Sequence, residues 1–441
     1  MPLSHILILG AGPAGLSAAL AISQLPPPPS PAAAPRLRVT VLELRPRGAG
    51  TTLGGAVNLT PLALRYLDRL GGAGALLRPR GCAVGAGIDM VALRTGSRRG
   101  TLWRGVDMLR VRRHDLAESL RGAVEEGDAQ AADGRGGGVE LRYGVSVVGI
   151  REEGEAGGEG AVVLELEGGE EIRGDVLLGC DGLHSVARTR YVEPEREKVY
   201  SGRVNAYGYA KVEEPGKAGI TRSDGQPCVV DSTLISGRYG SLLATFFEPE
   251  RKGLFVAAVM GMKDVGEDED ARDGWKAMGD DKAKVREDIA RRFRDGKISG
   301  VTELVESVEE WNLFPVYQLP PQGRWSRGRV ILLGDAAHAM PPQGESTGVA
   351  IEDGVLIARI LQRHTERSIP QLFDDYEKLR RAPIDKLYKE SVWRWDNAAK
   401  DDSGWLHAVF NDWMITAVLA FMDFNQSDYF ANDVENLQLP P

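Results

Sequence analysis

The feature that most constrains the fold is the glycine-rich stretch HILILGAGPAGLSAALAISQL, residues 5–25. An apolar run stops at glycine and apolar residues then return at helical spacing, which predicts a buried strand, a tight turn and a helix. In a G-x-G-x-x-G turn, Gly10 permits the turn, Gly12 lets the backbone approach a pyrophosphate, and Gly15 lets the helix pack on the strand. The helix N-terminus then offers free N–H groups to phosphate. The stretch therefore predicts a βα unit that binds a dinucleotide.

A dinucleotide site of this kind also needs an acidic residue at the end of the second strand, where it accepts hydrogen bonds from ribose hydroxyls. Glu43, in VTVLELRP, meets this requirement. It follows Gly15 by 28 residues, where about 20 is usual. The insertion PPPPSPAAAP at residues 26–35, predicted to be a stiff surface loop, accounts for the excess. A solvated glutamate at a strand terminus is the alternative interpretation.

Composition limits the classes of partner and the cellular compartment that are expected. The formal charge is −9, from 54 basic and 63 acidic residues, and there is no long basic run, so nucleic acid and anionic membrane are not expected as main partners. Cys82, Cys180 and Cys228 lie far apart without metal-ligand spacing, which predicts structural thiols and no metal site. The apolar residues 413–422 fall short of the ~20 needed to span a bilayer, so we expect a buried or amphipathic helix and a cytoplasmic protein.

Strand and helix patterns divide the chain into parts. GVSVVGI, AVVLELEG and EIRGDVLLGCDG predict a meander of strands. From about residue 200, GRVNAYGYAKVEE, SLLATFFEPE and GLFVAAVMG read as strands without helices between them, and DKAKVREDIARRF follows as a helix. The prediction is an α/β fold with α+β elements: a Rossmann-like domain at residues 1–199 and 325–370, an inserted antiparallel-sheet substrate domain at 200–324, and a helical C-terminal region at 371–441.

A second motif lies far from the first, in VILLGDAAHAMPPQGESTGVAIEDG at residues 330–354. A strand-like run stops at Gly-Asp, crosses a turn rich in proline and glycine, and resumes as a helix from about Thr347 or Gly348. A plain NAD-dependent dehydrogenase would leave this motif unexplained. His338 within it is expected to support the turn more often than to act as a base.

The motifs, in this order, resemble the flavin-dependent aromatic hydroxylases, the para-hydroxybenzoate and salicylate hydroxylase family of single-component monooxygenases. The resemblance covers about residues 3–395. GAGPAG is similar to the ADP loop, RRHDLAESL to the R-x-D-L-x-x-x-L helix start, LLGCDGLHSVAR to the Asp-Gly motif, and GRVILLGDAAHAMPP to the Gly-Asp motif. The resemblance implies an FAD-binding domain, with contacts to FAD from Gly10, Gly12, Ala14, Gly15, Glu43, Arg45, Ala56, Arg113, Asp181, Asp335 and Gly348.

The same resemblance implies the chemistry. NADPH or NADH reduces FAD, and the reduced flavin takes up O2. The flavin C4a-hydroperoxide then transfers one oxygen atom to an aromatic or polyketide-like small molecule by hydroxylation or epoxidation. A helix that begins near Gly348 would direct a partial positive charge at the flavin pyrimidine edge and favour the anionic reduced ring. A monomer or a homodimer is expected.

The sequence departs from the family pattern at two places. GESTG stands where relatives often have G-E-G-x-N, which removes an asparagine side chain. Many relatives that act on acidic phenols carry Tyr-Arg-Gly and a later tyrosine in the substrate sheet; Gly208 and Phe246 occupy these positions, so a more apolar pocket is expected. The substrate candidates are Arg203, Tyr207 and Phe246, and Arg203 is the candidate to replace the missing arginine.

Other functions of the same fold remain open. A halogenase would carry Trp-x-Trp-x-Ile-Pro, whereas WRWDNA, which begins at Trp393, has only the tryptophan pair. A prenyl reductase shares the fold. A non-catalytic, prenyl-binding relative is disfavoured because Glu43, Arg113 and Asp335 are all present.

Overall fold

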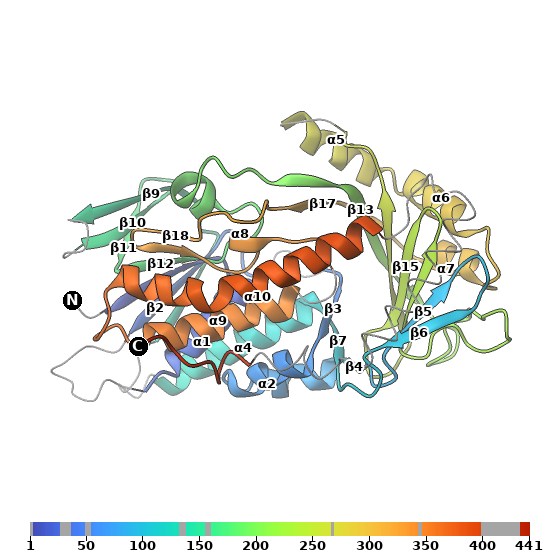
Figure 1. Ribbon diagram of the computed structural model, residues 1–441, viewed down its shortest axis with the longest axis horizontal. Helices are drawn as coiled ribbons and strands as arrows, with labels where there is room; N and C mark the ends of the chain where they lie inside the picture. Colours follow the sequence, from blue (N-terminus) through green and yellow to red (C-terminus); the bar gives the residue numbers. More distant parts are fainter. Residues whose placement is uncertain are drawn as a thin grey trace.

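The protein contains two principal sheets with a helical layer on each (Figure 1). The computed structural model describes residues 3–26, 37–48, 54–131, 138–154, 160–265, 269–342, 346–397 and 433–441. The predicted loop at 26–35 and the predicted helix at 413–422 lie almost wholly or wholly outside these ranges. The first two residues of GESTG, Gly344 and Glu345, lie outside them as well.

The first sheet carries the glycine-rich turn. Its six strands have the order β18-β19-β12-β1-β2-β8, and all neighbours are parallel except β18 and β19. The strands are β1 (His5–Leu9), β2 (Arg38–Glu43), β8 (Val139–Tyr143), β12 (Val176–Gly179), β18 (Ser326–Arg327) and β19 (Val330–Leu332). The wholly buried run of β1 explains its continuous apolar sequence, because a parallel strand is covered on both faces. The predicted α/β, Rossmann-like class is confirmed.

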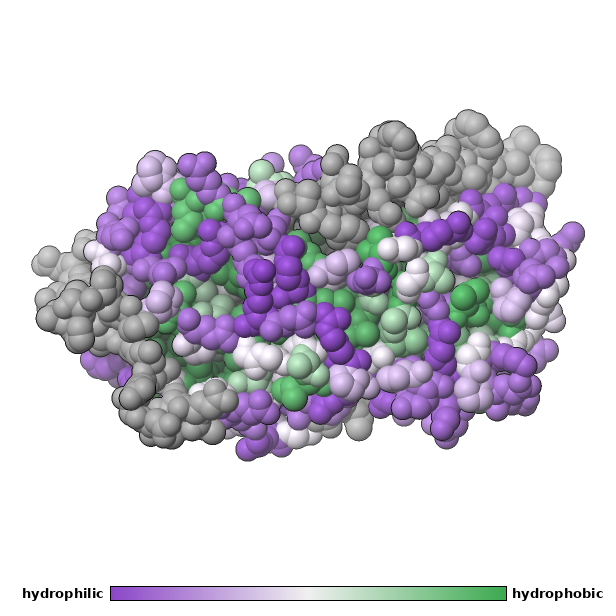
Figure 2. Space-filling model, turned by 90° about the horizontal axis from the view of Figure 1, so that it is seen from below, coloured by the Kyte–Doolittle hydropathy of each residue, from purple (hydrophilic) through white to green (hydrophobic). Residues whose placement is uncertain are grey.

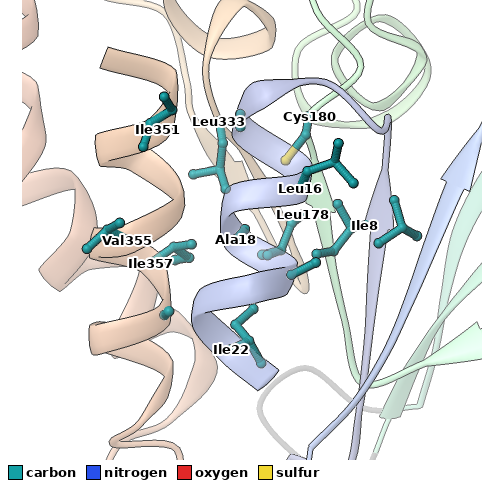
Figure 3. Close-up of a cluster of buried hydrophobic side chains, with 14 of the residues drawn as sticks. Ile8, Leu16, Ala18, Ile22, Leu178, Cys180, Leu333, Ile351, Val355 and Ile357 are labelled. Atoms are coloured by element: carbon teal, nitrogen blue, oxygen red, sulfur yellow. The ribbon is translucent and has the colours of Figure 1, made fainter. Parts of the chain in front are cut away.

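One face of this sheet is covered by helices. α1 (Pro13–Ser23) lies between the sheet and α9 (Ser346–Leu361), as Figure 3 shows for Leu16, Ala18 and Ile351. Gly354 permits the close crossing, since a Cβ there would lie 2.6 Å from the backbone N of Ala18. The other elements of this part are α2 (Pro61–Arg69), α3 (Ala73–Leu77), a 3-10 turn (Arg78–Arg80), α4 (Arg113–Ala131), a π-helical turn η2 (Arg188–Val192), α8 (Asp335–His338) and α10 (Ile369–Asn397).

Two small sheets complete this half of the molecule. The predicted meander is confirmed as the antiparallel sheet of β9 (Val147–Gly154), β10 (Gly160–Leu166) and β11 (Glu171–Gly174). The other joins β3 (Ala56–Leu59), β7 (Leu109–Arg112) and β4 (Cys82–Ala83), all antiparallel. This second small sheet leads from the first principal sheet toward the other.

The second principal sheet has seven strands in the order β17-β13-β16-β15-β14-β5-β6. They are β5 (Ile88–Ala92), β6 (Arg98–Leu102), β13 (Val199–Lys211), β14 (Ser232–Gly237), β15 (Gly240–Phe246), β16 (Gly253–Gly261) and β17 (Asn312–Gln318). Helices α5 (Glu269–Asp280), α6 (Lys282–Phe293) and α7 (Val301–Ser307) lie at this end of the molecule (Figure 1). Side chains of all three helices share a buried cluster with the sheet.

This sheet differs from the predicted one in two respects. It is not wholly antiparallel, because β14 and β5 run parallel. It also takes two strands, β5 and β6, from the segment that the sequence analysis assigned to the dinucleotide-binding domain. The predicted helix DKAKVREDIARRF is confirmed as α6, which begins after the capping residue Asp281.

The three cysteines are free and buried. None of the helices in the described ranges is long and apolar enough to cross a membrane. On the face seen in Figure 2, hydrophilic residues predominate and hydrophobic residues show in several separate areas.

Candidate active site

One cavity of about 1760 Å³ connects the two principal sheets. It begins at the glycine-rich turn, passes the carboxyl ends of the parallel strands, and ends on the face of the seven-stranded sheet. Ligands of doubly wound sheets bind outside the carboxyl ends of the strands. Pockets for small ligands usually measure about 300–1000 Å³, so this cavity has room for a dinucleotide and a second molecule.

The three glycines of the first turn serve different needs. Gly10 has φ +104°, and a Cβ there would lie 2.6 Å from the Cys180 carbonyl oxygen; a Cβ at Gly15 would lie 2.0 Å from the Gly10 oxygen. The fold itself therefore requires both. A Cβ at Gly12 would meet no protein atom within 4 Å, yet Gly12 and Ala14 line the cavity at the uncapped N-terminus of α1. This open approach to free N–H groups fits a pyrophosphate.

Glu43 lies at the end of β2 and lines the same part of the cavity. Its carboxylate oxygens accept hydrogen bonds from the backbone N–H groups of Ala11 (2.9 Å) and Arg45 (3.0 Å). These bonds fix the side chain beside the turn, and each oxygen keeps a lone pair for a hydroxyl donor. The geometry fits a ribose, with Arg45 alongside.

The Gly-Asp turn is held from behind by a buried ionic network. The Asp353 carboxylate, wholly buried on α9, accepts hydrogen bonds from the Gly334 N–H (2.8 Å), His338 Nε2 (2.8 Å) and Arg380 Nε (2.6 Å). Burial by itself would raise the pKa of Asp353, but the Arg380 and His338 charges outweigh it and hold that pKa well below its usual range. His338 therefore supports the turn, as expected.

Asp335, next in the turn, points its carboxylate at the cavity. The side chain is exposed to the cavity space although protein surrounds the position, and no group in the described part of the chain donates a hydrogen bond to it. Burial raises the pKa of Asp335, while the His338 and Arg113 charges act in the opposite sense. An unpaired carboxylate at this depth fits a polyol such as the ribityl chain of FAD. Ser346 and Thr347, at the start of α9, line the cavity beside it; Gly348 packs 3.5 Å from Ala63, measured from its ideal Cβ position.

Asp335→Asn is expected to stabilise the FAD-free protein at neutral pH and to weaken FAD binding. A raised pKa in the folded state means that stability is lost as pH rises, beginning near the ordinary aspartate value of about 3.9. The stability gain of the variant should therefore be absent at pH 3, appear above pH 4, and persist to pH 7. Thermal unfolding with and without FAD would measure both effects; equal stability of the two FAD-free proteins at pH 7 would contradict the prediction.

Arg113 and Asp181 both line the cavity, although they lie far apart in the sequence. The backbone N–H of Arg113 donates to the Gly55 carbonyl (2.9 Å), and the Arg113 charge acts on both Asp335 and Tyr207. Asp181 lines the cavity, but its carboxylate accepts from Ser185 Oγ (2.6 Å) and the Val186 N–H (2.6 Å). Its side chain thus orders its own turn.

The cavity ends on an aromatic floor. Tyr207 stacks on Phe314 (5.4 Å between ring centroids, 9° between planes) and packs against Phe255 (5.7 Å). The Tyr209 hydroxyl donates to the Gly54 carbonyl (2.7 Å), which ties this floor to the loop before β3. Ala56, the first residue of β3, lines the cavity at this junction. A flat apolar molecule would fit between the floor and the Gly-Asp turn.

Two predicted substrate contacts do not line the cavity. Phe246 is fully buried in the cluster shared with the helices, because alternation along β15 turns it to the opposite face from Leu243. Phe246 is therefore wrong as a substrate contact. Arg203 lies over the Trp395 ring (5.5 Å) and does not line the cavity either. Gly208 also faces away from it, since a Cβ there would lie 2.2 Å from the Glu310 oxygen.

Several supporting residues were not foreseen. Arg188 donates to the carbonyls of Leu183 (2.7 Å) and Ala336 (3.2 Å), and so joins the Asp-Gly and Gly-Asp turns. Arg196 donates to the Ala337 carbonyl (3.0 Å). Arg188 ends the quoted LLGCDGLHSVAR motif, which was the one available signal; nothing in the local sequence marks Arg196 or Arg380.

Sequence comparisons agree with this site. An FAD binding domain family matches residues 274–391. Salicylate hydroxylase of Pseudomonas putida is 27% identical over 416 residues, which covers 89% of this chain and 84% of the relative. Phenazine 1,6-dicarboxylic acid hydroxylase PhzS of Lysobacter antibioticus is 27% identical over 405 residues, with 86% and 87% covered.

Solved structures share the fold. Klebsiella pneumoniae HpxO complexed with FAD and uric acid has a TM-score of 0.66 at 19% identity, covering 98% of this chain and 96% of that one. Pseudomonas aeruginosa PqsL in complex with 2-aminobenzoylacetate has a TM-score of 0.67 at 18% identity, covering 91% and 97%.

The fold and the cavity define an FAD-binding flavoprotein. With the relatives above, the chain resembles the FAD-dependent aromatic hydroxylases and is an oxidoreductase of the monooxygenase class. FAD as the cofactor is confirmed.

Proposed function

We propose that this protein uses NADPH or NADH to reduce FAD and then inserts one oxygen atom from O2 into an aromatic small molecule. The observation that carries the proposal is the single cavity that joins the glycine-rich turn, the Gly-Asp turn and the aromatic floor. A molecule bound on the aromatic floor would therefore lie in the same cavity as a cofactor bound at Asp335.

The residues around the cavity would divide the cofactor between them. The N–H groups at Gly12 and Ala14 would take the pyrophosphate, Glu43 the ribose, and Asp335 the ribityl hydroxyls. The N-terminus of α9 would lie toward the ring edge, where a positive helix end stabilises negative charge. When bound and reduced, FAD supplies the activation of O2. Contacts from Arg45, Ala56, Arg113, Asp181 and Gly348 belong to the same proposal.

The protein's own part in the chemistry is positioning and water exclusion. Tyr207 and Phe314 offer a flat apolar surface on which an aromatic ring stacks. The Arg113 charge acts to lower the pKa of both Asp335 and Tyr207. It would therefore also stabilise negative charge on an aromatic ring bound in the cavity. Two curated relatives are named for hydroxylation of aromatic acids, which favours hydroxylation over epoxidation. A prenyl group or a halide has no comparable support.

Visible spectroscopy of the purified protein tests the proposal. We expect an oxidised flavin spectrum that bleaches on anaerobic addition of NADPH or NADH, faster when an aromatic substrate is present. Readmission of O2 should then give a hydroxylated product, detected by mass spectrometry with an oxygen isotope from O2. A protein that stays colourless after reconstitution with FAD would overturn the proposal.

A further inference from the structure

The cavity has a polar recess that neither the cofactor nor the aromatic floor uses. Its two polar residues, Asn58 and Arg110, are cross-strand partners in β3 and β7. Both line the cavity, yet only 2% of Asn58 and 4% of Arg110 is exposed. A positive charge and an amide are therefore enclosed at the edge of a largely apolar chamber.

Arg110 is a buried cation without an acidic partner. Within the described residues, no carboxylate lies within ion-pair distance of its guanidinium, which makes one long hydrogen bond to Ser232 Oγ (3.5 Å), while its Nε has none. Burial lowers the pKa of Arg110 to about 10, so the group is still charged at neutral pH. A buried charge without a partner is costly and calls for a partner from outside.

Asn58 is only half satisfied in the same place. Its Nδ2 contacts Met108 Sδ (3.1 Å), and its Oδ1 has no hydrogen-bond donor among the described groups. The recess thus presents unpaired donors on one residue and an unpaired acceptor on the other. A ligand with an anionic oxygen and a nearby O–H or N–H would satisfy both.

The walls of the recess suit the ring that would carry such groups. Ile88, Trp103 and Leu234 line the cavity here, and Met108 packs behind them in the same cluster. Trp103 has φ 57°, a left-handed conformation that is rare for a bulky residue. Strained residues of this kind concentrate at ligand sites, and this one places its side chain on the cavity wall.

We propose that Arg110 and Asn58 determine substrate specificity by anchoring the carboxylate end of an aromatic acid, with Asn58 Oδ1 accepting from a donor beside it. The inference rests on the proposed function. Arg110 lies in β7, whereas Gly208, where the family pattern has an arginine, lies in β13.

Binding measurements on the FAD-loaded protein, without NAD(P)H, test this subsite apart from turnover. Calorimetry measures the binding of two pairs of probes: meta-hydroxybenzoate with meta-hydroxybenzamide, and 2-naphthoate with 2-naphthamide. At least one acid should bind about 10- to 100-fold more tightly than its amide, the range for a charge-assisted hydrogen bond. Arg110→Gln should bring that preference close to one, whereas Arg238→Gln, which removes an exposed arginine at the cavity rim, should retain it.

Asn58→Asp is a second test of the subsite, needed because Arg110→Gln could lose acid binding through misfolding. The new carboxylate would lie across the strands from Arg110, satisfy its charge internally, and abolish acid binding in a stable protein. If no pair shows a preference for the acid, or if the preference survives in Arg110→Gln, the subsite is refuted. Flavin content and reduction by NADPH, measured on the same samples, show separately whether the proposed function holds.

Discussion

Gly12→Val is expected to yield a folded protein that no longer retains FAD. The added side chain meets no protein atom within 4 Å of its Cβ, so the fold has no reason to change. It would, however, occupy the approach to the N-terminus of α1, where the pyrophosphate is proposed to bind. Loss of two charge-assisted hydrogen bonds corresponds to a fall in FAD affinity of about 100-fold or more. The affinity is measured by fluorescence titration of the FAD-free protein with FAD, after its folding has been verified.

Gly85→Val is the matched control. Its Cβ also meets nothing within 4 Å, but Gly85 does not line the cavity, so FAD affinity should be unchanged. Gly10→Val should behave differently again and destabilise the protein itself, because its site has no room and a positive φ. Retention of normal FAD affinity by Gly12→Val would show that the cofactor does not approach this turn.

Arg380→Met should destabilise the protein by about 3–5 kcal/mol, the usual cost of removing one partner from a buried ion pair. Arg380 is 4% exposed and contacts Asp353, Glu352 (2.8 Å) and the Val349 carbonyl (3.0 Å). Urea unfolding of the FAD-free protein measures the loss. Arg78→Met, which removes an exposed pair with Asp68, should cost about 1 kcal/mol or less.

The difference in free energy of unfolding between Arg380→Met and the native protein should become smaller at acidic pH. Because the pKa of Asp353 is depressed in the folded state, its contribution is present above the unfolded value of about 3.9 and is lost as pH falls below it. The native protein therefore loses more stability between pH 5 and pH 3 than the variant does. A gap that stays constant over this range would show that Arg380 acts by packing alone.

Local sequence was sufficient to predict that the motifs proposed to bind the cofactor meet at one cavity. Gly10 directly follows β1, Glu43 is the last residue of β2, and Asp335 lies three residues after the end of β19. Parallel strands bring their carboxyl ends to one edge of the sheet. Their convergence on one cavity thus follows from the order of the motifs. The proline-rich insertion lengthens the connection before β2 without displacing the strand, because β2 still pairs with β1 and still ends at Glu43.

The substrate half depends on facts that local sequence does not contain. Which side of β15 faces the cavity is a matter of register, and a shift of one residue exchanges Phe246 for its neighbour Phe247. Phe247 packs against Tyr209, on the other face from Phe246. Arg110 lies in a strand far from the others in sequence, and its lack of an acidic partner is visible only once the chain has folded.

The order of the seven-stranded sheet has a consequence for how the chain reaches its native state. β5 and β6 come from residues 88–102, whereas β17, at the opposite edge, ends at residue 318. More than two hundred residues must leave the ribosome between the first strand of this sheet and the last, and contacts so distant in sequence form slowly. A fragment of residues 200–324 would also leave the β14 edge without its native neighbour, open to pairing between chains. We therefore expect the two halves of this enzyme to be inseparable in expression, although each has its own core.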